Sequence, residues 1–325
     1  MKQTMKAIVQ RTYGLPDVLE MSEAPIPSID DDQVLIRVHA SSVNALEWHL
    51  MTGTPYLVRP QAGFTKPKRE ILGADVAGTV EEVGANVTRF KPGDDVFGEV
   101  GGGYAEYTVA RPKTLVLKPV NATFEQAAAV PVAALTALQG LRDHGRIEPG
   151  QRVLINGASG GVGTFAIQIA KTLGAEVTAV CSTGNVDTAQ SLGADKVIDY
   201  TRTDFTESER DYDLMLDIAG TGSVSGCVSV LAEAGRYIVV GGPKGRWLGP
   251  LPRLAKAKLA FVRGDRTMGF FVASPKEKDL TTLAEWMEAG SLVPVIEATY
   301  PLSEVPDALR RFGQGHAQAK TVITV

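Results

Sequence analysis

The spacing of hydrophobic residues changes near residue 123. Before that point, short apolar runs are separated by Gly and Pro, a pattern typical of a compact antiparallel β unit. The runs cover residues 5–11, 34–40, 75–83, 94–98, 104–109 and 115–118. We therefore expect a β-rich unit in the first third of the chain.

Beyond residue 123, apolar patterns of strand and helix type alternate. An Ala-rich segment, 124–141, predicts a helix. Strands are expected at 152–156, 176–181, 196–199, 214–218, 236–240 and 267–272. Strands that alternate with helices indicate a parallel, doubly wound sheet, so we expect the class α/β.

The C-terminal segment returns to a mixed pattern. It predicts a helix at 275–289, a strand near Ile296, a helix at 303–313 and a last strand at 321–325. A lone strand needs a sheet to join, and we expect this one to join the N-terminal unit. The expected domains are residues 1–123 with 273–325, and residues 124–272.

A glycine-rich loop follows the strand expected at 152–156, and a helix with one apolar face follows the loop. Free backbone N–H groups and the helix dipole make such a strand–turn–helix a site for a pyrophosphate. Ala158 stands where the first Gly of the usual pattern belongs, and a turn that binds nothing is the alternative. The residues expected to contact a dinucleotide are Ser159, Gly160, Gly161, Val162 and Gly163.

Composition narrows the classes of function. The chain has 325 residues, 44% hydrophobic and 22% charged, with a net charge of −4. No apolar run is long enough to span a bilayer, and nothing in the charge favours nucleic acid. The N-terminus lacks the pattern of a secretory signal, and two cysteines cannot form a disulfide framework. We expect a cytoplasmic enzyme.

Several motifs together resemble the medium-chain dehydrogenase/reductase superfamily, in its order and spacing. They lie at 34–44, 72–80, 90–96, 129–131, 135–137 and in the glycine loop. Residues 181–187 and 191–200 further resemble the quinone oxidoreductase branch, including relatives of the reticulon-4-interacting protein. The resemblance implies a GroES-like catalytic domain, a Rossmann domain, an active-site cleft between them, and a homodimer formed through the cofactor domain.

Zinc members of this superfamily carry a Cys after an early strand and a His in a Gly-His-Glu segment. Here Asn44 stands at the Cys position and Ala74 at the His position. Zinc requires imidazole, thiolate or carboxylate donors, and Asp75 alone cannot replace two lost ligands. The four histidines are not at ligand spacing on one face. We therefore expect no metal.

Reduction of a quinone or an α,β-unsaturated carbonyl needs a well-placed hydride donor and hydrogen bonds to the oxygen that gains charge. By the resemblance, Asn44 and Tyr56 are the candidate catalytic donors. The alternatives are a helix N-cap for Asn44 and a packed loop aromatic for Tyr56.

Thr136 resembles the family threonine near the nicotinamide, and a buried threonine that bonds its own helix is the alternative. Two further segments each end an expected parallel strand, and we expect them to contact the nicotinamide half of the cofactor. They are Gly241 with Gly242, at the ribose, and Phe270, Phe271 and Val272, at the carboxamide.

The preferred cofactor depends on the end of the second parallel strand. An NAD-selective site has Asp or Glu there, whereas this chain has Ser182 and Thr183. By the resemblance, Tyr200 contacts a 2′-phosphate. Many NADPH-using relatives carry Lys or Arg in this loop where this chain has Gly184, so we expect modest selectivity unless a distant base such as Lys320 reaches the site. The nearest acid is expected to be Asp187, pointing away. The expectation is NADPH.

The function expected is a zinc-independent, NADPH-dependent oxidoreductase that transfers hydride to a quinone, an enone or a related small carbonyl compound. One alternative is a structural or sensor protein that binds NADPH without significant turnover. Another is a zinc alcohol dehydrogenase, which Asn44 and Ala74 argue against.

Overall fold

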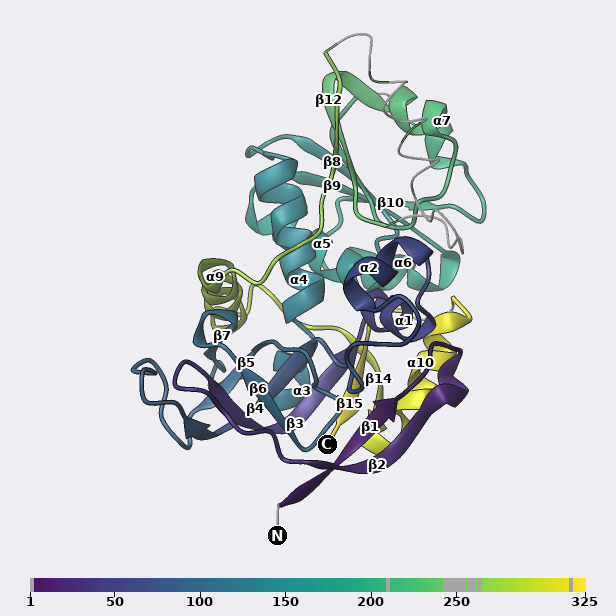
Figure 1. Cartoon of the computed structure of the whole chain (residues 1–325). Helices are drawn as coiled ribbons and strands as arrows, with labels where there is room; N and C mark the ends of the chain where they lie inside the picture. Colours follow the sequence, from purple (N-terminus) through teal and green to yellow (C-terminus); the bar gives the residue numbers. More distant parts are fainter. Residues whose placement is uncertain (1–2, 209–210, 242–254, 256–260, 262–264, 316–317) are drawn as a thin grey trace. The chain divides into compact units, whose positions relative to one another are not determined.

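The computed structural model describes residues 3–208, 211–241, 255, 261, 265–315 and 318–325 (Figure 1). The chain divides into two compact units. Unit 1 consists of Met1–Leu135 and Pro275–Val325, and unit 2 of Thr136–Ser274. The first boundary falls inside a helix, α4 (Pro131–Leu138), and not in a linker.

The main sheet of unit 1 has seven strands and includes both ends of that unit's chain. Strand β15 pairs antiparallel with β3 and parallel with β14, so the prediction that the last strand joins the N-terminal unit is confirmed (Figure 1). The order is β14-β15-β3-β4-β5-β7, with β6 on β3. The strands are β3 (Val34–Val43), β4 (Asp75–Val83), β5 (Asp95–Glu99), β6 (Tyr107–Ala110), β7 (Leu115–Leu117), β14 (Ile296–Pro301) and β15 (Lys320–Thr324).

A two-stranded sheet, β1 (Thr4–Gln10) with β2 (Leu19–Pro25), also belongs to unit 1. The sequence did not predict β2. Its residues, LEMSEAP, include one buried side chain, Leu19, because the strand is half solvated along its length. Because its residues do not alternate between apolar and polar, the sequence lacks the pattern that predicts a strand.

The helix expected at 124–141 is wrong as a single element. Residues Phe124–Ala128 form α3, a new helix starts at Pro131, and a π-helical segment, η4 (Gln139–His144), follows it. Proline has no N–H to donate, so α3 ends before Pro131 and α4 begins with it. The remaining helices of unit 1 are α1 (Ala45–Thr52), α2 (Arg59–Ala62), α9 (Glu277–Glu288) and α10 (Val305–Gly313), with short 3₁₀ turns η1 (Pro16–Val18), η2 (Tyr56–Val58), η3 (Pro112–Thr114) and η7 (Leu302–Glu304).

Unit 2 contains a six-stranded parallel sheet of order β10-β9-β8-β11-β12-β13. In sequence order this is the 3-2-1-4-5-6 arrangement of dinucleotide-binding folds. Three of its strands have the predicted bounds. Two of them, 152–156 and 176–181, are almost entirely buried and give near-continuous apolar runs, whereas 196–199 buries only Ile198. The strands are β8 (Arg152–Asn156), β9 (Glu176–Cys181), β10 (Lys196–Asp199), β11 (Tyr212–Asp217), β12 (Leu231–Val239) and β13 (Thr267–Phe270).

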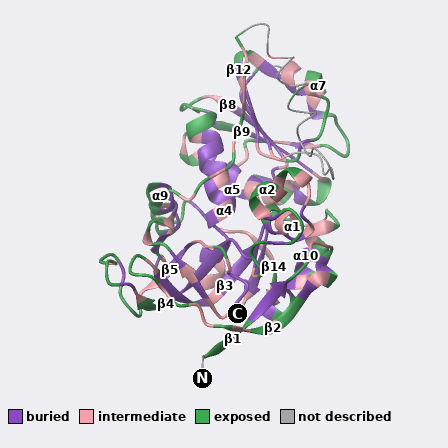
Figure 2. Cartoon of the chain, in the orientation of Figure 1, coloured by how far each residue is buried: buried purple, intermediate pink, exposed green. Residues whose placement is uncertain are grey.

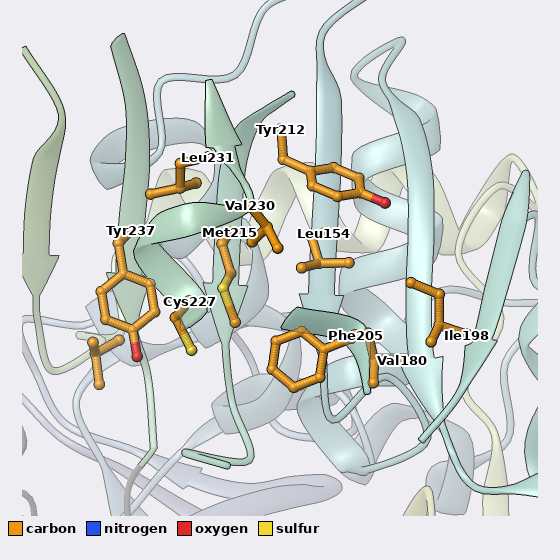
Figure 3. Close-up of a cluster of buried hydrophobic side chains, with 11 residues drawn as sticks. Leu154, Val180, Ile198, Phe205, Tyr212, Met215, Cys227, Val230, Leu231 and Tyr237 are labelled. Atoms are coloured by element: carbon orange, nitrogen blue, oxygen red, sulfur yellow. The ribbon is translucent and has the colours of Figure 1, made fainter. Parts of the chain in front are cut away.

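Side chains on alternate positions of this sheet enter two cores. Leu154, Val180 and Met215 point to the face that carries α7 (Val224–Ser229), where Cys227 and Tyr237 complete a buried cluster (Figure 3). The sheet strands are largely buried, whereas helix surfaces and loops are exposed (Figure 2). Among the described residues of unit 2, the other helices are α5 (Gly161–Thr172) and α6 (Val186–Ser191), with 3₁₀ turns η5 (Thr183–Asn185) and η6 (Phe205–Glu207).

Candidate active site

The glycine loop lies between β8 and α5, at the carboxyl end of the sheet. Gly160 is the N-cap of α5, and no side chain caps the helix. Thr164 N–H donates to the Gly160 carbonyl at 3.0 Å and starts the helical ladder. The three preceding N–H groups therefore have no acceptor in the first turn, which is the arrangement that receives an anion.

Gly163 lies where α5 passes closest to the loop. A Cβ built there would lie 2.2 Å from the Gly157 carbonyl oxygen and 2.6 Å from the Ala158 carbonyl. At Gly160, the nearest atom to such a Cβ would be the Gly157 oxygen, at 3.5 Å. Gly163 thus serves internal packing, and Gly160 leaves open space in front of the helix.

The loop also marks the place where the strand order reverses, between β8 and β11. Open parallel sheets bind ligands at this point. Asp217, at the end of β11, is fully buried and accepts from Asn156 Nδ2 at 2.7 Å and from the Tyr237 hydroxyl at 2.5 Å. It also accepts from Gly220 N–H at 2.9 Å, which fixes the turn after β11. Sequence reasoning missed this network.

Ser182 and Thr183 follow β9, as expected, but their surroundings differ from the expectation. Ser182 Oγ accepts from Asn185 Nδ2 at 2.9 Å. The Thr183 hydroxyl donates to Asp199 Oδ2 at 2.6 Å, and this hydrogen bond lowers the pKa of Asp199. The nearest acid is therefore Asp199 on the neighbouring strand, and the expectation that it would be Asp187 is wrong.

The same corner carries an aromatic side chain and a cation. Tyr200 follows β10 and is 58% exposed. Arg202 Nε lies 3.4 Å from Asp199 Oδ2, and most of the Arg202 side chain is exposed. The corner thus presents hydroxyl groups, one carboxylate and one guanidinium.

The residues assigned to the nicotinamide half are spread over three elements of unit 2. Thr136 is half-buried in α4, and Gly241 follows β12. Phe270 ends β13 and is 48% exposed. Phe271 stacks on His144 with ring centroids 4.3 Å apart, whereas Val272 is exposed. Gly242 lies outside the described residues.

In unit 1, Asn44 is the N-cap of α1, and its backbone N–H donates to Glu47 Oε2 at 2.8 Å. The other Glu47 oxygen accepts from Ala74 N–H at 2.7 Å. The side-chain amide of Asn44 also has partners outside the helix. It donates through Nδ2 to Asp75 Oδ2 at 2.8 Å and accepts through Oδ1 from Lys320 Nζ at 2.6 Å.

Lys320 occupies a different environment from the one expected. It is 2% exposed, and Nζ donates to Asn44 Oδ1, to the Val43 carbonyl at 3.3 Å and to Asp75 Oδ2 at 3.4 Å. An ammonium has three N–H groups, and these acceptors use all of them. The assignment of Lys320 as a base for the 2′-phosphate is therefore corrected: it is a buried partner of Asn44 and Asp75.

We call Ser42, Asn44, Glu47, Asp75 and Lys320 the buried polar cluster. Asp75 also accepts from the Ser42 hydroxyl and from Val132 N–H. Burial, reinforced by the charge of Asp75, raises the pKa of Glu47 to about 7. The same causes raise the pKa of Glu99, opposite Asp75 on β5, to about 8. The cluster concentrates charge where water has little access.

Tyr56 begins η2 in the loop after α1. The Arg59 guanidinium lies 4.5 Å from the centroid of the Tyr56 ring and 4.7 Å from that of Tyr13. The Tyr13 hydroxyl donates to the Gly63 carbonyl at 2.6 Å, and Arg59 Nε to the Gly53 carbonyl at 3.1 Å. These contacts pack the Tyr56 ring against the Arg59 guanidinium and connect Arg59 and Tyr13 to the backbone around the loop.

The residues at the two zinc-ligand positions cannot bind zinc. Asn44 offers an amide whose oxygen already accepts from an ammonium, and Ala74 offers no donor at all. Across the described ranges, no group of three or more His, Cys, Asp or Glu side chains could hold a metal ion. The donor set does not fit a catalytic zinc.

Comparison with known proteins identifies relatives over the whole chain. A family model described as alcohol dehydrogenase GroES-like domain matches residues 30–120, and one described as zinc-binding dehydrogenase matches residues 192–323. The mitochondrial NAD(P)H oxidoreductase RTN4IP1 of Bos taurus is 36% identical over 99% of this chain and 89% of its own length. The chloroplast envelope quinone oxidoreductase homolog of Arabidopsis thaliana is 33% identical over 98% of each chain.

A solved structure, the quinone oxidoreductase from Coxiella burnetii, superimposes with a TM-score of 0.88 at 30% identity. It covers 99% of this chain and 100% of its own. Both parts of the expected fold, GroES-like and Rossmann, are confirmed. In the part of the chain that the structure describes, no helix is long and apolar enough to cross a membrane. Relatives are named as mitochondrial and chloroplast proteins, so a cytoplasmic location stays a prediction.

Proposed function

The chain belongs to the medium-chain dehydrogenase/reductase superfamily, and we propose that it is an NADPH-dependent reductase of quinones or enones that works without zinc. At the level of the family it is an NAD(P)H-dependent oxidoreductase of the quinone oxidoreductase-like type. The acceptor, the preference for NADPH and the independence from zinc are the proposed parts.

The observation that carries the proposal is the pair of hydrogen bonds made by the side-chain amide of Asn44. In place of a metal ligand, this position holds an amide fixed between Lys320 and Asp75 in the buried polar cluster. Oxidation of an alcohol requires a Lewis acid or a base to ionise the hydroxyl. Reduction of an electron-poor carbon requires only positioning and donors to an oxygen, which amides and phenols can supply.

The glycine loop supports a dinucleotide. The uncapped start of α5 would hold the pyrophosphate through Gly161, Val162 and Gly163 N–H groups, with Ser159 beside them. Gly160 leaves the space that a phosphate needs. When bound, the nicotinamide supplies the hydride. In unit 2, Thr136, Gly241 and Phe270 to Val272 are proposed to orient it.

Asn44 and Tyr56 are the proposed donors to the acceptor oxygen. As hydride reaches a ring or β-carbon, the carbonyl oxygen gains the electron pair and then takes a proton from solvent. The amide N–H of Asn44 and the phenol of Tyr56 would stabilise that charge. Each such donor is typically worth about 10²-fold in rate.

The cofactor preference rests on the corner formed by β9 and β10. Ser182, Thr183 and Tyr200 offer hydroxyl groups to a 2′-phosphate. Arg202, which the sequence analysis did not assign to the cofactor, adds a positive charge beside them. Asp199 opposes a phosphate in the same place, since its lowered pKa keeps it ionised. We therefore propose a modest preference for NADPH, and a homodimer in solution as in the family resemblance.

The test is NADPH consumption by exhaustively chelated protein with a panel of quinones, enones and aldehydes. We expect turnover with quinones or enones, unchanged by chelation, and slower turnover for Asn44→Ala. NADPH binding without turnover on any acceptor would favour a cofactor-binding protein without catalytic activity. Activity that disappears on chelation and returns with Zn²⁺ would indicate a zinc dehydrogenase.

A further inference from the structure

Lys320 and Asp75 place opposite charges on the two ends of one amide. Lys320 Nζ lies 2.6 Å from Asn44 Oδ1, and Asp75 Oδ2 lies 2.8 Å from Asn44 Nδ2. Lys320 is 2% exposed and Asp75 is fully buried. Water therefore cannot replace either partner, and the hydrogen bonds act at the strength of a low-dielectric interior.

The chemistry of these partners fixes the orientation of the amide. An ammonium only donates, so the atom that faces it must be the amide oxygen. A carboxylate only accepts, so the atom that faces it must be the amide nitrogen. A flipped Asn44 would point its NH₂ at Lys320 and its oxygen at Asp75, and both contacts would be repulsive. The orientation of the amide is therefore set by the charges of its two partners.

One N–H of Asn44 is left over. Nδ2 carries two hydrogens, and within residues 3–208, 211–241, 265–315 and 318–325 it has one acceptor, Asp75. Asn44 keeps 8% of its surface exposed. The Lys320 ammonium also draws electron density from the amide oxygen, which makes the remaining N–H a stronger donor.

We propose that Lys320 and Asp75 are positioning residues that lock the Asn44 amide with its free N–H directed at the substrate oxygen. This inference rests on the proposed function, because it assumes that Asn44 donates to that oxygen. It assigns a role to Lys320, which no motif marked, and to Asp75, which the sequence suggested only as a possible zinc ligand. In effect, an oriented amide takes over the electrostatic task for which relatives with zinc use the metal.

The kinetic test uses Lys320→Met and Asp75→Asn, each alone and combined with Asn44→Ala. If both residues act through Asn44, each should lower kcat about tenfold, a fraction of the roughly 10²-fold effect of losing a donor. Neither should change kcat by more than about twofold when Asn44 is already Ala. KM and NADPH affinity should stay near the parent values, because the contact strengthens only in the transition state.

Lys118→Met is the matched control. Lys118 also lies in unit 1 and donates to two backbone carbonyls, those of Pro119 and Ala122, but has no contact with the buried polar cluster. It should turn over like the parent. Effects of Lys320→Met or Asp75→Asn that multiply with Asn44→Ala would overturn the inference, as would full activity of both single variants. Asp75→Asn preserves shape, so it serves if Lys320→Met does not fold.

A measurement independent of turnover separates this inference from the proposed function. The side-chain NH₂ signals of Asn44, assigned in ¹⁵N spectra by their loss in Asn44→Ala, should be well dispersed and slow to exchange with water in the parent. In Lys320→Met and Asp75→Asn they should shift and exchange faster. Unchanged signals in both variants would refute the anchoring. If the signals change but no acceptor is reduced, the proposed function fails and the anchoring stands.

Discussion

Gly163→Ala tests the close contact that builds the phosphate loop. The new Cβ would lie 2.2 Å from the Gly157 oxygen and 2.6 Å from the Ala158 carbonyl, well inside the 3.4 Å of ordinary contact. All of these neighbours are backbone atoms, so α5 must move by about 1 Å relative to the loop. Overpacking of this kind costs about 1–3 kcal/mol. The better helix propensity of Ala returns at most about 1 kcal/mol.

The expected result is a net loss of about 2 kcal/mol, because contacts this short should cost about 3 kcal/mol, the upper end of that range. For a unit of this size, 1 kcal/mol lowers Tm by about 2–4 °C, so we expect a decrease of about 4–8 °C by calorimetry. NADPH affinity should fall as well, because the N–H groups at the start of α5 move with the helix.

Gly160→Ala is the matched control in the same loop. Its φ of −78° suits any residue, and its Cβ would meet only the Gly157 oxygen, at 3.5 Å. We expect Tm within about 1 °C of the parent but at least about tenfold weaker NADPH binding by fluorescence titration, because the methyl group fills the phosphate space. The reasoning is refuted if Gly163→Ala keeps the parent Tm, or if Gly160→Ala binds NADPH like the parent.

Three further substitutions test other parts of the site. Asp199→Asn removes the carboxylate beside Thr183 and should raise the ratio of NADPH to NADH affinity several-fold; an unchanged ratio in cofactor titrations would exclude Asp199 from the site. Glu99 has its pKa raised to about 8, so the folded state holds its proton longer than the unfolded state does. The contribution of Glu99 to stability should therefore be greatest below about pH 4.5 and fall as pH rises toward 8, by at most about 1.4 kcal/mol per pH unit. Glu99→Gln should flatten that slope in denaturant titrations, and an identical slope would contradict the shift. Tyr56→Phe should lower kcat by about 10²-fold with NADPH affinity nearly intact, and parent-like turnover would remove Tyr56 from the mechanism.

The Rossmann part of the fold could be predicted in detail because the residues that indicate each of its strands and turns are neighbours in the sequence. Strands β8 and β9 are almost entirely buried and have near-continuous apolar runs, and β10, of which only Ile198 is buried, follows at the expected spacing. The loop at Gly157 to Gly163 is likewise a contiguous signal. Strand β2 could not be predicted, since its stability depends on pairing with β1 and not on an apolar face.

The active site was predictable only where a motif marked it. Asn44 was found through the resemblance, whereas its contact with Lys320 was not, because Lys320 lies 276 residues away and reaches Asn44 only through the register of β15 on β3. Asp199 was missed for a similar reason. The rule for NAD or NADP selectivity considers the residue at the end of the second parallel strand, β9. The acid lies instead on the third strand, β10, in register with Cys181.

The most direct measurement follows the hydride itself. Chelated protein is incubated with an enone and NADPH deuterated at C4, each epimer in turn, and the product is analysed by mass spectrometry and NMR. We expect one epimer to deliver a single deuterium to the β-carbon, with the rate unaffected by chelation. Product without deuterium from either epimer, or transfer only after Zn²⁺ is added, would contradict a zinc-independent hydride transfer.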